Sequence, residues 1–195
     1  MAHDSVLWQA VLPVVDALAA LPASYYIGGS VASSFAGIAR FTQDADLVAD
    51  LRPPHAVPLA ERLEGAYYVD RERIARAIVD QRSFNAIHLH TAFKVDVFVA
   101  GDAPFAREAL ERRIAIRVPD LGRSLDFSSA EDIVLHKLQW FAQARGVSDV
   151  QWQDVQGILR LQRQGLDHAY LQLWAEQLGL ADLLRRALDD AGVSG

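Results

Sequence analysis

Residues 25–48 read YYIGGSVASSFAGIARFTQDADLV, and this stretch decides the fold. The pattern predicts a short strand, a turn at Gly28-Gly29-Ser30, a short helix, and a second strand that carries Asp44 and Asp46. Because strand side chains alternate, both carboxylates point to one face of the strand and the apolar residues between them point to the other. A Gly-Gly-Ser turn that opens a helix presents backbone N–H groups suited to phosphate. Together these features indicate that the chain handles a nucleotide with a divalent metal.

A third carboxylate, Asp96, lies in the alternating run 92–99. This run and the preceding run 83–90 are typical of an antiparallel hairpin, in which Lys94 and Asp96 share one face. Three carboxylates on neighbouring strands would hold two hard cations such as Mg²⁺, one activating an attacking oxygen and one steadying a leaving group. Under the alternative interpretation, Asp44 and Asp46 are solvated residues of an exposed sheet face, since an isolated Asp-x-Asp motif is common.

The remaining patterns predict an α+β domain over residues 1–125 and an all-helical domain over residues 126–195. In the first part we expect Pro13 to kink or divide an N-terminal helix, and we expect further helices at 55–64, 71–79 and 103–112 and strands at 66–69 and 114–118. In the second part Ser128 to Glu131 matches a capping box that opens a long helix, followed by helices at 148–163, 167–178 and 181–190. The tryptophans of these helices are predicted to lie in the core; they are Trp140, Trp152 and Trp174.

Composition excludes several classes of protein. The 195 residues contain no cysteine, so disulfides, thiol catalysis and cysteine-based zinc sites are excluded. A net charge of −6 argues against an extended nucleic-acid surface. No run approaches the roughly 18 apolar residues of a transmembrane helix, and the N-terminus lacks the charged region of a signal peptide. We therefore expect a cytoplasmic protein with no membrane partner.

A set of motif residues within 25–99 resembles the nucleotidyltransferase superfamily, which shares the fold of DNA polymerase β. The set comprises Gly28, Gly29, Ser30, Arg40, Thr42, Asp44, Asp46, Leu47 and Asp96. Within the superfamily the chain is most similar to the small bacterial AbiEii-type proteins, many of which are toxin components of toxin–antitoxin pairs. The helical part is similar to the same group more loosely, through Glu131-Asp132, Lys137 and Asp154-Val155, and it departs from better-studied toxin members by lacking their paired lysines.

The resemblance implies a role for each of these positions. Three aspartates would bind two Mg²⁺ ions and carry catalysis: Asp44, Asp46 and Asp96. A nucleoside triphosphate would be contacted by Gly28, Gly29, Ser30, Arg40 and Lys137, with Lys137 reaching the phosphates from the other side of a cleft. Lys94 and Asp154 would support the site. Taken on residue type alone, Lys137 and Asp154 are more typical of solvated charges on helix surfaces.

The resulting hypothesis is an Mg²⁺-dependent, ATP-binding nucleotidyltransferase that moves a nucleoside monophosphate to a hydroxyl of an RNA end, a protein or a small molecule. It would act as the toxin of a pair with a cognate antitoxin. One alternative is a non-catalytic binding module that keeps the fold and acts through a protein partner. For a small acceptor such as an aminoglycoside, the C-terminal helices offer three acidic residues, namely Glu176, Asp182 and Asp189.

Overall fold

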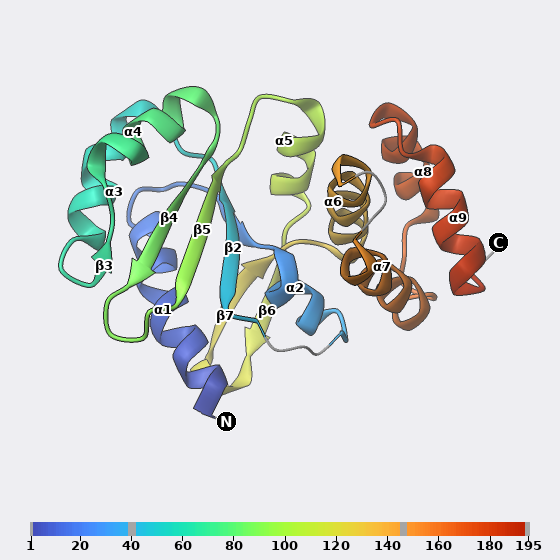
Figure 1. Ribbon diagram of the computed structural model, residues 1–195, viewed down its shortest axis with the longest axis horizontal. Coiled ribbons are helices and arrows are strands. Elements are labelled where there is room, and N and C mark those ends of the chain that lie inside the picture. Colours follow the sequence, from blue (N-terminus) through green and yellow to red (C-terminus); the bar gives the residue numbers. More distant parts are fainter. Residues whose placement is uncertain (1, 39–41, 145–147, 194–195) are drawn as a thin grey trace. The chain divides into compact units, whose positions relative to one another are not determined.

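The computed structural model describes residues 2–38, 42–144 and 148–193 (Figure 1). The chain divides into two compact units, one made of Met1–Val31 and Phe41–Phe127 and the other of Ala32–Arg40 and Ser128–Gly195. The first unit holds the strands and the second is helical, which confirms the predicted α+β class with a helical C-terminal part. The units assign residues 32–40 to the helical part, whereas the sequence places one boundary near residue 125; the division into domains stays a prediction.

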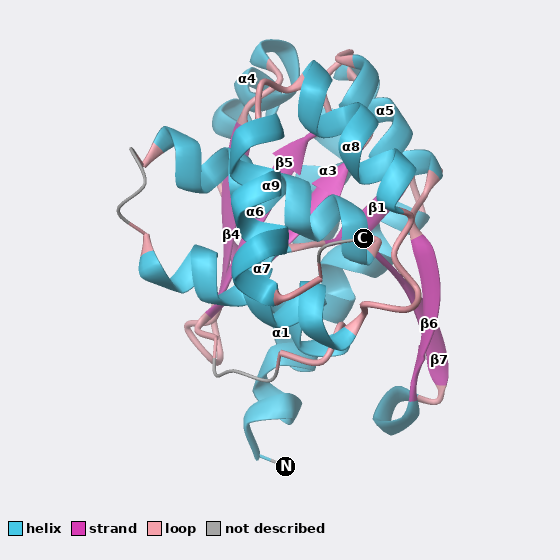
Figure 2. Cartoon of the chain, turned by 90° about the vertical axis from the view of Figure 1, so that its right-hand side faces the viewer, coloured by secondary structure: helices cyan, strands magenta, loops and turns pink. Residues whose placement is uncertain are grey.

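The first unit is built on a mixed sheet, which has seven strands within the described residues. In spatial order the strands are β3 (Tyr67–Tyr68), β4 (Ser83–His88), β5 (Lys94–Val99), β2 (Asp44–Ala49), β1 (Tyr25–Ile27), β7 (Arg123–Phe127) and β6 (Ile114–Val118). Strand β2 runs parallel to β5, β1 runs parallel to β7, and the other neighbours are antiparallel. Figure 2 shows β6 and β7 as a hairpin at one edge of this unit.

One face of the sheet is closed by helices α1 (Ala2–Ala19), α3 (Ala56–Leu63) and α4 (Arg71–Asp80). The central strands turn alternate residues toward it, and these are buried: Ala45, Leu47, Val95 and Val97. The hydroxyl of Tyr67 donates to the carbonyl of Ala10 over 2.6 Å and ties the edge strand β3 to α1. This closed face is the core against which the central strands are fixed.

Helix α1 is continuous through Pro13, so the predicted division of the helix is wrong, and the predicted kink stays a prediction. Pro13 and Gln9, which lies one turn earlier, are both on the exposed side of the helix. The pyrrolidine ring removes a backbone donor and crowds the preceding turn, and on this side both effects face solvent. The buried stripe of α1 on the opposite side holds the helix together.

Within the first unit, helix covers only part of the opposite face of the sheet. Helix α5 (Pro104–Glu111) packs there, where Ala109 and Leu110 form a small apolar cluster with Tyr26 and Ala100. Val48 packs against the same cluster. The N-terminal half of β2 and the facing half of β5 carry polar side chains on this face instead. This face is therefore apolar beside α5 and polar around Asp44, Asp46, Lys94 and Asp96.

The second unit contains α6 (Ala130–Gln143), α7 (Asp149–Leu161), α8 (His168–Gln177) and α9 (Ala181–Ala191), and α2 (Gly29–Phe35) begins in the first unit and ends in this one. Helix α7 packs against α6 and α9. Two short 3₁₀ turns, Pro53–His55 and Pro119–Leu121, complete the regular elements. Among the helices described, none combines the length and the apolar character needed to cross a bilayer.

The start of α6 differs by one residue from the predicted capping box. Ser129 is the N-cap, and its hydroxyl oxygen accepts from the backbone N–H of Asp132 over 3.2 Å. The carboxylate of Asp132 accepts in turn from that hydroxyl at 2.8 Å and from the hydroxyl of Tyr170 at 2.7 Å. Glu131, expected to complete the box, instead accepts from the backbone N–H of Asp167.

The tryptophans of the helical unit only partly follow the prediction. Trp174 is buried, as expected. Trp152 packs its ring 4.8 Å from that of Phe141, and the guanidinium of Arg186 lies 4.7 Å from its centroid. Trp140 is 54% exposed, so its assignment to the core is wrong. Its position on α6 falls outside the stripe formed by Val134, Leu138 and Phe141.

Candidate active site

The three predicted aspartates lie on one face of the sheet. Strands β2 and β5 are parallel, with Asp46 directly opposite Asp96 and Asp44 directly opposite Lys94. Since paired residues of neighbouring strands point the same way, all four side chains share the face opposite to the one that α1, α3 and α4 close. The Asp96 side chain is 14% exposed and that of Asp44 is 45% exposed. The structure therefore brings the aspartates together, and their catalytic role stays a prediction.

An ammonium group lies among these carboxylates. Lys94 Nζ lies 2.6 Å from Asp96 Oδ2 and 3.5 Å from Asp44 Oδ2. The hydrogen bond to Asp96 raises the pKa of Lys94 above its ordinary value, so the side chain is cationic at neutral pH. Asn85 Nδ2 donates to Asp96 Oδ1 over 2.8 Å, and the Thr42 hydroxyl donates to Asp44 Oδ1 over 3.0 Å. Lys94 thus binds two of the predicted metal ligands.

The Gly28-Gly29 turn lies directly against Asp46, one of these carboxylates. The N–H of Gly28 donates to the carbonyl of Asp46 over 2.8 Å. Gly29 has φ +55°, and a Cβ at this position would overlap the Asp46 carboxylate, whose Cγ would lie 2.7 Å away. Only glycine tolerates both the left-handed backbone and this close approach. Ser30, the third residue of the predicted phosphate turn, is half-buried at the start of α2.

The donor chemistry of the site fits a hard divalent cation. Carboxylate oxygens are the ligands that Mg²⁺ prefers, and a positive charge already lies between Asp44 and Asp96 in the form of Lys94. As the side chains are arranged, no set of three or more His, Asp or Glu side chains in the described ranges converges closely enough to hold a metal ion. The two predicted Mg²⁺ ions therefore stay a prediction.

Two further predicted site residues belong to the helical unit. Lys137 on α6 and Asp154 on α7 form a buried ion pair, with Lys137 Nζ 2.7 Å from Asp154 Oδ2 and 3.1 Å from Gln151 Oε1. The two charged side chains are only 6% and 5% exposed, so the interpretation of either as a solvated charge is wrong. Their roles in nucleotide binding stay predictions. Arg40 lies outside the described residues.

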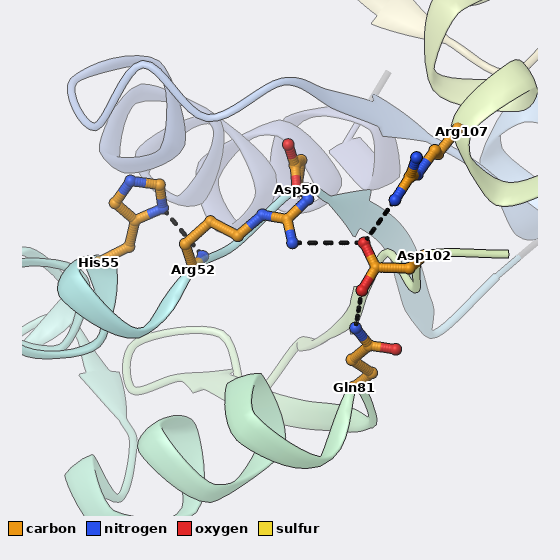
Figure 3. Close-up of polar contacts among 6 residues, drawn as sticks. All are labelled: Asp50, Arg52, His55, Gln81, Asp102 and Arg107. Atoms are coloured by element: carbon orange, nitrogen blue, oxygen red, sulfur yellow. Dashed lines mark hydrogen bonds and ion pairs between the residues drawn. The ribbon is translucent and has the colours of Figure 1, made fainter.

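A second polar cluster was not predicted (Figure 3). Asp102 Oδ1 accepts from Arg107 at 3.0 Å and from Arg52 at 3.4 Å, while Asp102 Oδ2 accepts from Gln81 at 2.9 Å. Arg52 also pairs with Asp50 at 2.9 Å. Hydrogen bonds from Gln81, Arg107 and Arg52 hold the pKa of Asp102 below its ordinary value. The side chains are well exposed, so the cluster joins the ends of β2, α4 and β5 to α5 without forming a closed site.

In its fold the chain is similar to solved nucleotidyltransferases. The solution structure of the antibiotic-resistance factor ANT(2'')-Ia is 18% identical over 96% of this chain and 95% of that chain, with a TM-score of 0.53. The crystal structure of ANT(2'')-Ia in complex with adenylyl-2''-tobramycin is 18% identical over 90% of this chain and 97% of that chain, with a TM-score of 0.51. An antigenic nucleotidyltransferase-like protein from Paracoccidioides brasiliensis is 16% identical over 92% of this chain and 91% of that chain, with a TM-score of 0.50.

At these identities the likeness concerns the fold. No protein-family model matches the sequence, and no curated protein matches it.

Proposed function

We propose that the chain is a nucleotidyltransferase that moves a nucleoside monophosphate from a nucleoside triphosphate to a hydroxyl of a small molecule. The observation that carries the proposal is the contact between Gly29 and Asp46 beside Asp96. It fixes a glycine turn suited to phosphate against the carboxylates in a fold shared with solved nucleotidyltransferases. Neither feature alone has this specificity, because single Asp-x-Asp motifs and glycine turns are both common.

In the proposed reaction the acceptor oxygen attacks the α-phosphorus in line, the bond from that phosphorus to the bridging oxygen breaks, and pyrophosphate leaves. The carboxylates of Asp44, Asp46 and Asp96 would hold the Mg²⁺ ions. When bound, these ions would neutralise the negative charge of the phosphates. Asp96 orients the acceptor hydroxyl by accepting its hydrogen bond and takes up its proton as the new oxygen–phosphorus bond forms. The backbone N–H groups of the Gly28-Gly29-Ser30 turn orient the phosphates. Most of the rate acceleration would then come from positioning and charge complementarity.

The choice of a small acceptor is supported by the likeness to ANT(2'')-Ia, whose crystal structure contains adenylyl-2''-tobramycin and which this chain covers almost completely. An RNA or protein acceptor and an antitoxin partner rest on the sequence resemblance alone.

The proposal is tested by incubating the protein with each α-labelled nucleoside triphosphate and MgCl₂, first with tobramycin and related amino sugars and then with total RNA and cell lysate. The control is the double variant Asp44→Ala, Asp46→Ala, checked for folding by circular dichroism. We expect label on a small molecule with the wild type and none with the variant. Label on RNA or protein would show that the acceptor is that macromolecule and would refute the small-molecule acceptor. Nucleotide binding without transfer to any acceptor would support the non-catalytic module.

A further inference from the structure

In the free protein, every carboxylate oxygen of Asp44 and Asp96 has a partner. Thr42 and Lys94 hold the two oxygens of Asp44, and Asn85 and Lys94 hold the two oxygens of Asp96. Each oxygen keeps a second lone pair, so these contacts do not by themselves exclude a cation. A cation that binds here must, however, lie close to the Lys94 ammonium, whose like charge opposes its binding.

Lys94 is the partner best able to give way. Its ammonium sits on a flexible four-carbon stem, whereas Thr42 and Asn85 carry short side chains that follow the backbone. Its contact with Asp44 is long, at 3.5 Å, and its side chain is 41% exposed, so the ammonium has solvent into which it can swing. Like a metal ion, it bridges two carboxylates from neighbouring strands. The Lys94 ammonium therefore occupies the position proposed for the metal ion, and it carries a charge of the same sign.

We propose that Lys94 is a positioning residue that serves as the internal counter-cation of Asp44 and Asp96, and that a divalent cation binds tightly only when a nucleotide is present to accept the displaced ammonium. A cation alone must either bind beside the like-charged ammonium or displace it into solvent, and both lower its affinity. A nucleotide supplies phosphate oxygens to which the same ammonium can transfer. Cation and nucleotide then bind cooperatively, each raising the affinity for the other by the same factor. The inference rests on the metal-binding part of the proposed function and not on the transfer reaction.

The first test measures Mn²⁺ binding to the full chain without nucleotide, by the electron paramagnetic resonance signal of free Mn²⁺. The variants are Lys94→Met, which removes the charge, and Lys94→Arg, which keeps it. Arg71→Met is the matched control, because Arg71 forms another exposed ion pair of the same unit, with Glu64. We expect Lys94→Met to bind Mn²⁺ about tenfold more tightly than wild type, since a unit charge a few ångströms from the ion is removed. Lys94→Arg and Arg71→Met should match wild type.

The second test repeats the titration with a non-hydrolysable nucleoside triphosphate analogue. The analogue should raise the Mn²⁺ affinity of the wild type by a larger factor than that of Lys94→Met. Adding Asp44→Asn to Lys94→Met should remove the gain in affinity, which assigns it to this site. These titrations do not use transfer activity, so the inference can hold even if no acceptor is ever found.

Three results would overturn the inference. The first is equal or weaker Mn²⁺ binding by Lys94→Met, the second is an equal effect of the analogue on both proteins, and the third is no Mn²⁺ binding by any variant even with the analogue. If Lys94→Met is less stable than wild type, thermal melts distinguish a lost counter-cation from a general folding defect. A counter-cation role predicts a melting temperature that falls in EDTA and is restored by Mn²⁺. A lysine needed only for folding gives a fall that Mn²⁺ does not reverse, which would also refute the inference.

Discussion

The ammonium of Lys137 on α6 lies 2.7 Å from the carboxylate of Asp154 on α7, and both side chains are almost fully buried. Each charge has lost most of its contact with water and is stabilised chiefly by the other, with Gln151 accepting a further hydrogen bond from Lys137. The pair joins two helices of the helical unit. Its role is therefore in the packing of that unit.

Removing one partner of this pair should destabilise the protein strongly. We expect Lys137→Met or Asp154→Leu to lower the free energy of unfolding by about 3–5 kcal/mol, because either leaves an uncompensated buried charge. The double variant should recover most of the loss, since it leaves no charge behind. Urea denaturation measures all three. Arg185→Met breaks an exposed ion pair of the same unit and should cost less than about 1 kcal/mol. Equal costs for the buried and exposed pairs would contradict this account.

Replacing Gly29 by alanine should damage the carboxylate site as well as the fold. The substitution places a Cβ on a backbone with φ +55° and against the Asp46 carboxylate. Gly122→Ala is the matched control, because Gly122 also has a positive φ (+63°) but nothing lies within 4 Å of its Cβ position. We expect about 1–2 kcal/mol of destabilisation for Gly122→Ala and more for Gly29→Ala. Only Gly29→Ala should also reduce nucleotide affinity; unchanged nucleotide binding in that variant would argue against the proposed phosphate turn.

Tyr67 should make stability depend on alkaline pH. Burial raises the pKa of Tyr67 well above its ordinary value of 10.0, while its hydroxyl donates to the carbonyl of Ala10. Below pH 10 the phenol is neutral in both the folded and unfolded states. As pH rises further, the unfolded state ionises first, so this stabilisation is lost through the pH range between the two pKa values.

Tyr67→Phe isolates that effect. At neutral pH it should cost about 1 kcal/mol, the typical net contribution of one hydrogen bond. Above pH 10 its disadvantage relative to wild type should shrink, because phenylalanine cannot ionise. Tyr68→Phe removes an exposed hydroxyl from the next residue and serves as the control. The measurement is the unfolding free energy of the three proteins from pH 7 to 11; a constant difference between wild type and Tyr67→Phe would refute the account.

Local sequence patterns were enough for most of the strands and for the site face, because alternation and turn chemistry depend on neighbouring residues. The placement of Asp44, Asp46 and Asp96 on one face of the sheet followed from the alternation of side chains along two strands. Pairings between distant segments could not be predicted in this way. Lys137 and Asp154 are 17 positions apart on separate helices, and Arg52 and Asp102 are 50 apart. Strand β7 was missed, since its sequence RSLDF has only two buried residues and acquires its pairing from β1 and β6.

The most direct test of the central claim is the initial rate of label transfer from an α-labelled nucleoside triphosphate, compared between wild type, Asp46→Asn and Asp50→Asn. Both substitutions remove one carboxylate charge from the β2 segment, but Asp50 pairs with Arg52 beyond the end of the strand and lies outside the proposed site. The account predicts that Asp46→Asn lowers the rate by roughly 10²–10³-fold or more, the scale seen when a group that stabilises transition-state charge is lost. Asp50→Asn should remain near the wild-type rate. Equal rates for wild type and Asp46→Asn, with both proteins folded, would contradict the assignment of this carboxylate face as the active site.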